Sequence, residues 1–333
     1  MKDIVRVAAV QAEPVWFDLD GSVAKVIDLI GQAAAGGAQL VAFPETFVPG
    51  YPWWIWLDSP AAGMAYVPVY AATSMTRDGE HLAAICAAAK QHSIQVVLGF
   101  SERDAGSLYM AQAFIAADGE LTSVRRKLKP THVERAVFGE GDGSDLQVHS
   151  TPLGNVGGLN CWEHLQPLTK YAMYAQNEEI HIGAWPSFSV YVGAAQALSA
   201  EVNTAASLMY AVEGQTFVVA PCGVVGAAAI EKFCDTDVKR QLLQPGGGHA
   251  RIYGPEGSTL AQPLEPTEEG ILFADLDPTM IAIAKSVADP VGHYSRPDVL
   301  QLVVNRAPTP RTLDVFVPRE PAVDADSLVA EVV

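Results

Sequence analysis

The chain has 333 residues, of which 49% are hydrophobic and 18% are charged, and its formal net charge is −17. That length can bury one large core and also allows two domains. The acidic balance argues against nucleic acid and against an anionic membrane surface as partners, because both repel a negatively charged protein.

The cysteines do not indicate an oxidising compartment. Cys86, Cys161, Cys222 and Cys234 form no Cys-x-x-Cys pair and have no spacing typical of a disulfide framework. The first residues lack the apolar segment of a signal peptide, and no run of about 18 apolar residues is present. We therefore expect a soluble, cytoplasmic protein.

The chain begins with a pattern of strand, helix and strand. Residues 5–11 predict a buried strand, and residues 40–43 predict a second one. Between them a helix is predicted to begin at Asp20 or Ser22 and to end at Gly36, because one face carries Val23, Val26, Ile27 and Ile30. This order indicates a layered protein that combines helices and sheets.

The second strand runs directly into Pro44 and Glu45. A carboxylate at the end of a buried strand is costly unless it has a partner or a chemical task. Glu45 is therefore a candidate catalytic base, and a capping or salt-bridged glutamate is the alternative.

Residues 47–60 combine aromatic side chains with Pro49, Pro52 and Pro60, which excludes a regular helix. The segment follows Glu45 directly and contains Phe47, Tyr51, Trp53, Trp54 and Trp56. It can form an aromatic wall of a substrate pocket, or it can cover the core or contact another subunit.

The next segment ends in a cationic cluster. A helix is predicted over 78–91, a strand over 95–100 and a strand pair over 108–127 that turns at Asp118-Gly119. The pair ends at Arg125-Arg126-Lys127, and Lys129, Pro130 and Glu134 follow. A solvated basic face is the common explanation for such a run, and a catalytic cation is the other.

Cys161 occupies a predicted junction between a strand and a helix. The apolar run 156–159 ends at Asn160, and Pro167 opens a helical pattern to residue 174. Because the first N–H groups of a helix are unpaired and its dipole favours negative charge, this thiol is expected to ionise. A buried cysteine without a reaction is the alternative.

His164 follows Cys161 by three residues and could activate the thiol or support it structurally. We favour the structural role. No second ligand pair has the spacing of a zinc site, so no metal is expected.

The C-terminal half alternates again between strands and helices. We expect a strand over 179–184 before Trp185, a helix over 197–213 and a strand over 215–220. The Gly-rich stretches 223–229 and 245–248 have no predicted structure, and strands at 250–253 and 270–274 are expected to complete a second sheet. We expect one domain over residues 1–305 and a Pro-rich, acidic tail over 306–333.

Three of these segments occur together in one known family. The Glu of Phe43-Pro-Glu45, the Lys after Arg125-Arg126 and the Cys of Asn160-Cys-Trp-Glu-His164 resemble, in order, the motifs of the nitrilase branch of the carbon–nitrogen hydrolase superfamily. The resemblance extends from about Val5 to about Asp298. It implies a four-layer α-β-β-α sandwich, no cofactor, and homo-oligomers of dimers that stack into spirals, to which the tail could contribute.

The resemblance also implies a reaction. Cys161 would attack a nitrile, Glu45 would act as general base, Lys127 would stabilise the intermediate, and Glu134 would orient the groups. The backbone N–H of Trp162 could add to the stabilisation, with His164 as support.

The substrate is less defined than the reaction. We name as pocket candidates Tyr51, Trp54, His132, Trp185 and Phe188, whose aromatic character favours aryl or arylaliphatic nitriles. An amidase or carbamoylase, a cyanide hydratase or dihydratase, and an inactive scaffold of this fold are the alternatives. The pair Trp162-Glu163 after the nucleophile favours the nitrile branch.

Overall fold

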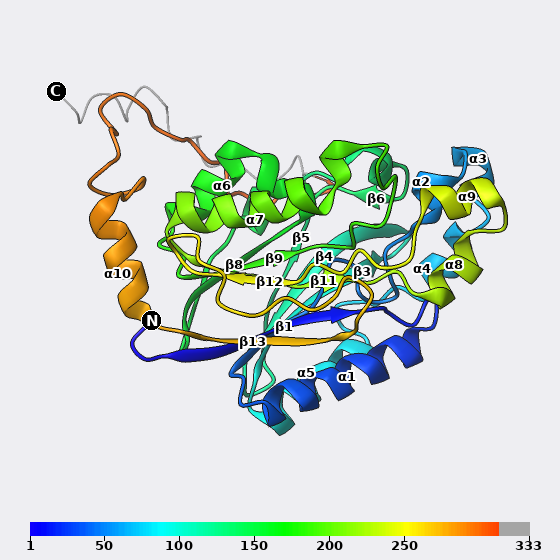
Figure 1. The fold of residues 1–333 in the computed structure, drawn as a ribbon, viewed down its shortest axis with the longest axis horizontal. Helices are drawn as coiled ribbons and strands as arrows, with labels where there is room; N and C mark the ends of the chain where they lie inside the picture. Colours follow the sequence, from blue (N-terminus) through cyan, green and yellow to red (C-terminus); the bar gives the residue numbers. More distant parts are fainter. Residues whose placement is uncertain (313–333) are drawn as a thin grey trace.

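Two β-sheets stacked against each other form the centre of the protein (Figure 1). The computed structural model describes residues 1–312. The first sheet has the order β11-β1-β2-β3-β4-β5, with β13 paired to β1 and β6 paired to β4. Its strands are β1 (Val5–Ala12), β2 (Leu40–Ala42), β3 (Gln95–Asp104), β4 (Ser107–Ile115), β5 (Leu121–Arg126), β6 (Phe138–Gly139), β11 (Cys222–Gly223) and β13 (Gly270–Leu276).

The second sheet has the order β12-β10-β9-β8-β7. Strands β8, β9 and β10 are parallel to one another, and β7 and β12 are antiparallel at the two edges. The strands are β7 (His149–Thr151), β8 (Gly154–Asn160), β9 (Ile180–Ala184), β10 (Phe217–Ala220) and β12 (Arg251–Tyr253).

Helices cover the outer face of each sheet and complete four layers (Figure 1). The first sheet is covered by α1 (Leu19–Ala35) and α5 (Glu80–His92), and the second by α6 (Pro167–Tyr174) and α7 (Ala200–Gly214). The expected α-β-β-α sandwich is therefore present. Asp18 caps α1 by accepting a hydrogen bond from the Gly21 N–H, so the predicted caps Asp20 and Ser22 are wrong by two residues or more.

Strand β1 explains why the early sequence reads as a continuous apolar run. Val7 and Ala9 belong to the core between the sheets, whereas Ala8 and Val10 belong to the core beneath α1 and α5. A strand that is buried on both faces loses the alternation of apolar and polar residues that marks a half-exposed strand.

The strand predicted at 270–274 lies in the first sheet, which corrects its assignment to the second. β13 is antiparallel to β1 along its whole length, with Val7 opposite Ala274. Of the two late strands only β12 extends the second sheet, beside β10. A period of two residues identifies a strand but carries no information about its partner, which is why the sequence misplaced it.

Short helices gather at one end of the sandwich, on the right in Figure 1. The segment 47–60 contains only single helical turns, α2 (Trp54–Leu57) and the start of α3 (Pro60–Gly63), and α4 (Val67–Ala72) follows. The unassigned Gly-rich region contains α8 (Ala227–Phe233) and α9 (Asp237–Leu242). An aromatic cluster, to which Trp16, Trp54, Tyr70 and Phe233 belong, packs this end of the molecule.

The chain after α10 (Pro278–Val287) turns back along the body of the protein. The Arg306 guanidinium donates to the Leu146 carbonyl, the Thr309 N–H donates to Asp142, and Arg311 pairs with Asp104. Most of the predicted tail, residues 313–333, lies outside the described residues, and its role in assembly stays a prediction. Within residues 1–312 no helix is long and apolar enough to cross a membrane.

Candidate active site

The candidate residues lie where strands of both sheets end. β2 and β3 are parallel, and β4 is antiparallel to both β3 and β5, so β2 and β5 run in the same direction. Glu45 follows β2, Lys127 follows β5, and Cys161 follows β8 of the second sheet. The Glu45 N–H donates to the Trp185 carbonyl at 3.3 Å, which joins the ends of the two sheets.

Lys127 lies between two carboxylates. Its Nζ is 2.9 Å from Glu45 Oε1 and 2.8 Å from Glu134 Oε2, and all three side chains are fully buried. Side chains alternate between the two faces along β5 and the residue that follows it, so Arg125 and Lys127 are both buried. Arg126, between them, points the other way and pairs with Glu102 and Asp104. Lys129, the rival by residue type, is exposed and paired with Glu140.

Glu45 reaches this position because β3 carries a glycine beside it. A Cβ added at Gly99 would lie 2.0 Å from the Pro44 carbonyl oxygen. Only glycine allows the chain around Glu45 to cross the sheet so closely.

Glu134 is held from several directions. It lies in a 3₁₀ helix, His132–Ala136, and its Oε2 also accepts from the Thr131 N–H at 2.6 Å. The Tyr51 hydroxyl donates to Oε1 at 2.8 Å and itself accepts from Trp56 Nε1 at 3.0 Å. The aromatic segment 47–60 is thus connected directly to the carboxylate that binds Lys127.

The turn that carries Cys161, here called the Cys161 turn (residues 160–165), is sharp. Cys161 has φ +47°, in the left-handed region that is unusual for a residue with a side chain. It begins a 3₁₀ helix, Cys161–Leu165, directly after the last residue of β8. Such a turn presents the side chain at the end of the strand.

The expected ionised thiol is wrong. Burial raises the pKa of Cys161 well above its usual value, and Glu45 raises it further, against the opposing effects of Lys127 and the Trp162 N–H. The long helix that was to stabilise a thiolate, α6, begins only at Pro167, after the 3₁₀ turn. The Cys161 side chain is therefore a neutral thiol, which would need a base before it could act as a nucleophile.

Burial and mutual charge interactions shift the pKa values of the ionisable groups around Cys161. Burial, opposed by Lys127, raises the pKa of Glu45 to about 8. Although burial alone would lower the pKa of Lys127, Glu134 and Glu45 raise it, so the ammonium stays charged. Glu45 Oε2 has no hydrogen-bond partner within residues 1–312.

A cavity of about 30 Å³ opens beside Cys161 and Glu134. Of the pocket candidates, Tyr51 and Phe188 line it. Trp53 and Trp56 of the predicted aromatic wall line it too, as do Val190, Leu198 and Asn203, which the sequence did not indicate. The sequence of segment 47–60, which is interrupted by prolines, did not predict which of its tryptophans face the cavity.

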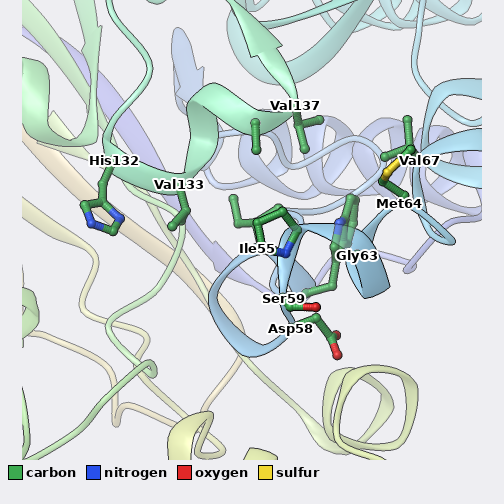
Figure 2. Close-up of a pocket in the computed structure, with 12 residues that line it drawn as sticks. Ile55, Asp58, Ser59, Gly63, Met64, Val67, His132, Val133 and Val137 are labelled. Atoms are coloured by element: carbon green, nitrogen blue, oxygen red, sulfur yellow. The ribbon is translucent and has the colours of Figure 1, made fainter.

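Trp54 and His132 do not line this cavity. They line a neighbouring pocket of about 280 Å³ between α2, α3 and the His132–Ala136 helix, and Figure 2 shows His132 beside Val133 there. Trp54 packs in the aromatic cluster, and His132 stacks on Trp56. Both residues therefore lie outside the cavity beside Cys161, and their part in substrate binding stays a prediction.

His164 contacts the Cys161 backbone, and Trp185 packs on His164. The two rings stack with centroids 5.2 Å apart, and Trp185 Nε1 donates to Ser207. His164 Nδ1 lies 2.6 Å from the Cys161 carbonyl oxygen, so the ring contacts the backbone rather than the thiol of Cys161. The Trp162 indole N–H donates to Asn203 Oδ1 at 2.8 Å. In the described part of the chain no group of three His, Cys, Asp or Glu side chains could hold a metal ion.

Comparison with known proteins places these features in a family. The sequence model described as carbon-nitrogen hydrolase matches residues 6–285. The chain is 58% identical to a nitrilase of Pseudomonas syringae pv. syringae (strain B728a) over 95% of this chain and 94% of the relative. It is 55% identical to an aliphatic nitrilase of Rhodococcus rhodochrous, over 91% of this chain and 83% of the relative.

A solved structure shares the fold. The crystal structure of a carbon-nitrogen hydrolase from Helicobacter pylori G27 superposes with a TM-score of 0.70 at 18% identity, covering 89% of this chain and 96% of that chain. At this identity the likeness concerns the fold alone.

Proposed function

Because the chain belongs to the carbon–nitrogen hydrolase family, we propose that it is a nitrilase, which converts an organic nitrile and two water molecules into a carboxylic acid and ammonia. The observation that carries the proposal is the buried cluster in which Lys127 binds Glu45 and Glu134 beside a neutral Cys161 thiol. The hydrolase domain would comprise residues 1–305.

Glu45 would be the general base. Its Oε1 is occupied by Lys127, and its free Oε2 can accept the proton of the Cys161 thiol as the sulfur attacks the nitrile carbon. The carbon–sulfur bond forms, one π bond of the nitrile opens, and a proton passes to the nitrogen, giving a covalent thioimidate. A neutral thiol with a raised pKa requires such a base.

Lys127 and the backbone N–H of Trp162 would stabilise the developing charge. Lys127 is charged, buried and fixed by two carboxylates, so little reorganisation is needed when negative charge appears on the substrate. One such donor contributes about 3–4 kcal/mol to a transition state. Glu134 would hold Lys127 in place and, through Tyr51, the aromatic wall of the cavity.

Water would complete the reaction in two steps. The first water, deprotonated by Glu45, adds to the thioimidate, and ammonia leaves the tetrahedral intermediate with a second proton. The acyl thioester that remains reacts with another water, and the carboxylic acid leaves as the thiol of Cys161 is restored.

We infer that the preferred substrates are short aliphatic nitriles. The cavity of about 30 Å³ has room for only one or two water-sized groups beside Cys161. A relative at 55% identity is named an aliphatic nitrilase. Aromatic side chains around the cavity, which favoured aryl nitriles in the sequence, reduce its size.

The protein is also proposed to form homo-oligomers. Exposed apolar side chains gather on the outer layer of the second sheet, at Leu165, Leu168, Met209 and Val212. Such a surface suits contact with a second copy of the chain. Light scattering of the wild type and of Leu168→Asp tests this: a larger species that the variant disrupts is expected, and a monomeric wild type would contradict it.

The function is tested by measuring ammonia and carboxylic acid released from a series of nitriles and from the matching amides. Wild type is compared with Cys161→Ala, and Cys86→Ala, a partly buried cysteine on α5, serves as the matched control. Acid from nitriles, lost only in Cys161→Ala, supports a nitrilase. Turnover of amides alone would make the protein an amidase.

A further inference from the structure

A chain of buried side chains, here called the histidine chain, leads from the Cys161 turn to α7. It consists of His164, His181, Glu178 and Tyr210. His164 Nε2 lies 2.9 Å from His181 Nε2, His181 Nδ1 lies 2.8 Å from Glu178 Oε1, and the Tyr210 hydroxyl donates to Glu178 Oε2 at 2.7 Å. All four residues are buried, and the proposed reaction uses none of them directly.

The Cys161 carbonyl determines which atom donates in every hydrogen bond of the histidine chain. A carbonyl only accepts, so His164 Nδ1 must carry the proton of their 2.6 Å contact. In a neutral His164 the Nε2 atom is then an acceptor, and His181 Nε2 must donate to it. This leaves His181 Nδ1 as an acceptor, so Glu178 Oε1 must donate and Glu178 must be a neutral carboxylic acid.

Other placements of the same proton put charge in the core. Moving it to His181 or on to His164 would create a buried cation and a buried Glu178 carboxylate. Burial opposes this: it raises the pKa of Glu178 to about 8 and lowers the pKa of His164 to about 3. Burial, and Arg125 beside it, also lower the pKa of His181.

The surroundings of the chain supply few other charges. Tyr174 of α6 packs edge-to-face against Tyr210 and donates to Glu213. Gly157 of β8 packs directly on Glu178 Oε1 without a side chain. From β5 and the Cys161 turn, Arg125 and Glu163 act on His181, and they form an ion pair with each other; Lys170 of α6 acts on His164.

Loss of the Glu178 proton would be felt at the nucleophile. A Glu178 carboxylate needs His181 Nδ1 to donate, which turns His181 Nε2 into an acceptor. His164 must then carry its proton on Nε2, and its Nδ1 lone pair faces the Cys161 carbonyl oxygen. One proton removed at the far end therefore replaces the hydrogen bond at the Cys161 turn with a repulsion.

We propose that Glu178, acting through His181 and His164, is a positioning residue whose single proton holds the backbone of Cys161 in its left-handed conformation. Loss of this proton at alkaline pH would disturb that conformation and stop catalysis. The inference rests on the proposed function for its kinetic test. Glu45 would impose a rise in activity with pH, because it must be ionised. Glu178 would impose a fall, because it must be protonated.

The deciding variant is Glu178→Gln. An amide N–H can donate to His181 Nδ1 and the amide oxygen can accept from Tyr210, so glutamine imitates the protonated acid but cannot titrate. We expect kcat at pH 7 within about threefold of wild type. Above pH 8, where wild type declines, the activity of the variant should go on rising to a plateau as Glu45 ionises. An unchanged alkaline decline in the variant would overturn the proposal.

Tyr210→Phe provides a second variant, and Tyr174→Phe is its matched control. Tyr210 lowers the pKa of Glu178 through its hydrogen bond, so removing the hydroxyl should move the alkaline decline to higher pH. Tyr174 donates to Glu213 rather than to Glu178, and its loss should leave the decline in place. If Tyr210→Phe does not move it, the proposal fails even where Glu178→Gln does not fold.

A measurement without substrate separates this inference from the proposed function. Folded Glu178 keeps a proton that the unfolded chain releases near its ordinary pKa, so wild type should lose stability relative to Glu178→Gln as pH rises from 5 to about 8. Denaturant unfolding at several pH values gives this difference. Equal pH dependence of the two proteins would overturn the inference, whether or not nitriles are hydrolysed.

Discussion

Arg125 and Glu163 form a buried, two-point ion pair that joins β5, which leads to Lys127, to the Cys161 turn. Arg125 Nη2 lies 2.7 Å from Glu163 Oε1, and Nη1 lies 2.9 Å from Oε2. The same carboxylate accepts from the N–H groups of Leu128, just after Lys127, and of Asn160, just before Cys161. The two sheets thus meet at one carboxylate next to the reaction centre.

Breaking this pair should destabilise the protein and stop catalysis. Glu163→Gln leaves Arg125 as an uncompensated buried charge, which costs about 3–5 kcal/mol of unfolding free energy. Denaturant unfolding and ammonia release measure the two effects. Asp298→Asn, which breaks the exposed pair with Arg296, is the control and should change neither. A Glu163→Gln protein as stable and active as wild type would contradict the assigned role.

The pH dependence of kcat/KM should rise on the acid side with an apparent pKa near 8, the value that burial gives Glu45. Glu134 raises that pKa through its negative charge, so Glu134→Gln should move the rise to lower pH while also lowering the maximum. Initial rates between pH 5 and 9.5 (about half-unit steps) decide this. A shift towards higher pH would show that another group titrates.

Removing the Tyr51 hydroxyl should lower kcat without unfolding the protein. Tyr51→Phe deprives Glu134 of a donor and leaves the Trp56 indole N–H without its acceptor. Unsatisfied buried groups of this kind cost about 1–3 kcal/mol, equivalent to roughly 5- to 100-fold in rate if the transition state bears the loss.

Tyr70→Phe is the matched control for Tyr51→Phe. Tyr70 is equally buried in the same aromatic cluster, but its hydroxyl donates to the Gly50 carbonyl. It should reduce stability and leave kcat near the wild-type value. Equal effects of the two substitutions on kcat would mean that Tyr51 only packs.

Enlarging the cavity should admit larger nitriles. Leu198 lines the cavity and is only partly buried, so Leu198→Ala adds space at modest cost to stability. We expect kcat/KM for an arylacetonitrile to rise about 10-fold relative to a short alkyl nitrile, since a few methylene groups of space contribute about 1–3 kcal/mol to discrimination. Leu260→Ala, away from the cavity, should leave the ratio unchanged. A wild type that already prefers the arylacetonitrile would refute the small-pocket account.

Local pattern and motif order identified much of the site before the structure. Their positions at strand ends made Glu45 and Cys161 candidates, and the family motif, in which a lysine follows two arginines, identified Lys127. The structure places Lys127 against Glu45 at the strand ends. These features depend on neighbours in the sequence, which is why sequence reading reached them.

Features that depend on distant partners were missed or wrong. The prediction that Cys161 is a thiolate was wrong, because burial raises the pKa of its thiol more than the nearby N–H groups lower it. The partner of β13, the separation of Trp54 and His132 from the cavity, and the hydrogen bond of Trp162 to Asn203 all join residues far apart in the chain. His181 lies in the segment read only as a strand, and Glu178 directly precedes that segment. Two ionisable residues around the start of a buried strand were a usable signal.

In the proposed reaction Cys161 forms a covalent bond to the nitrile carbon. The most direct measurement mixes wild type with a short alkyl nitrile, quenches the reaction in acid within one turnover, and locates the added mass by peptide mapping. We predict a thioimidate or acyl adduct on the peptide that contains Cys161, and none in Cys161→Ala. Acid production without an adduct, an adduct on Cys86, Cys222 or Cys234, or turnover that persists in Cys161→Ala would contradict the account.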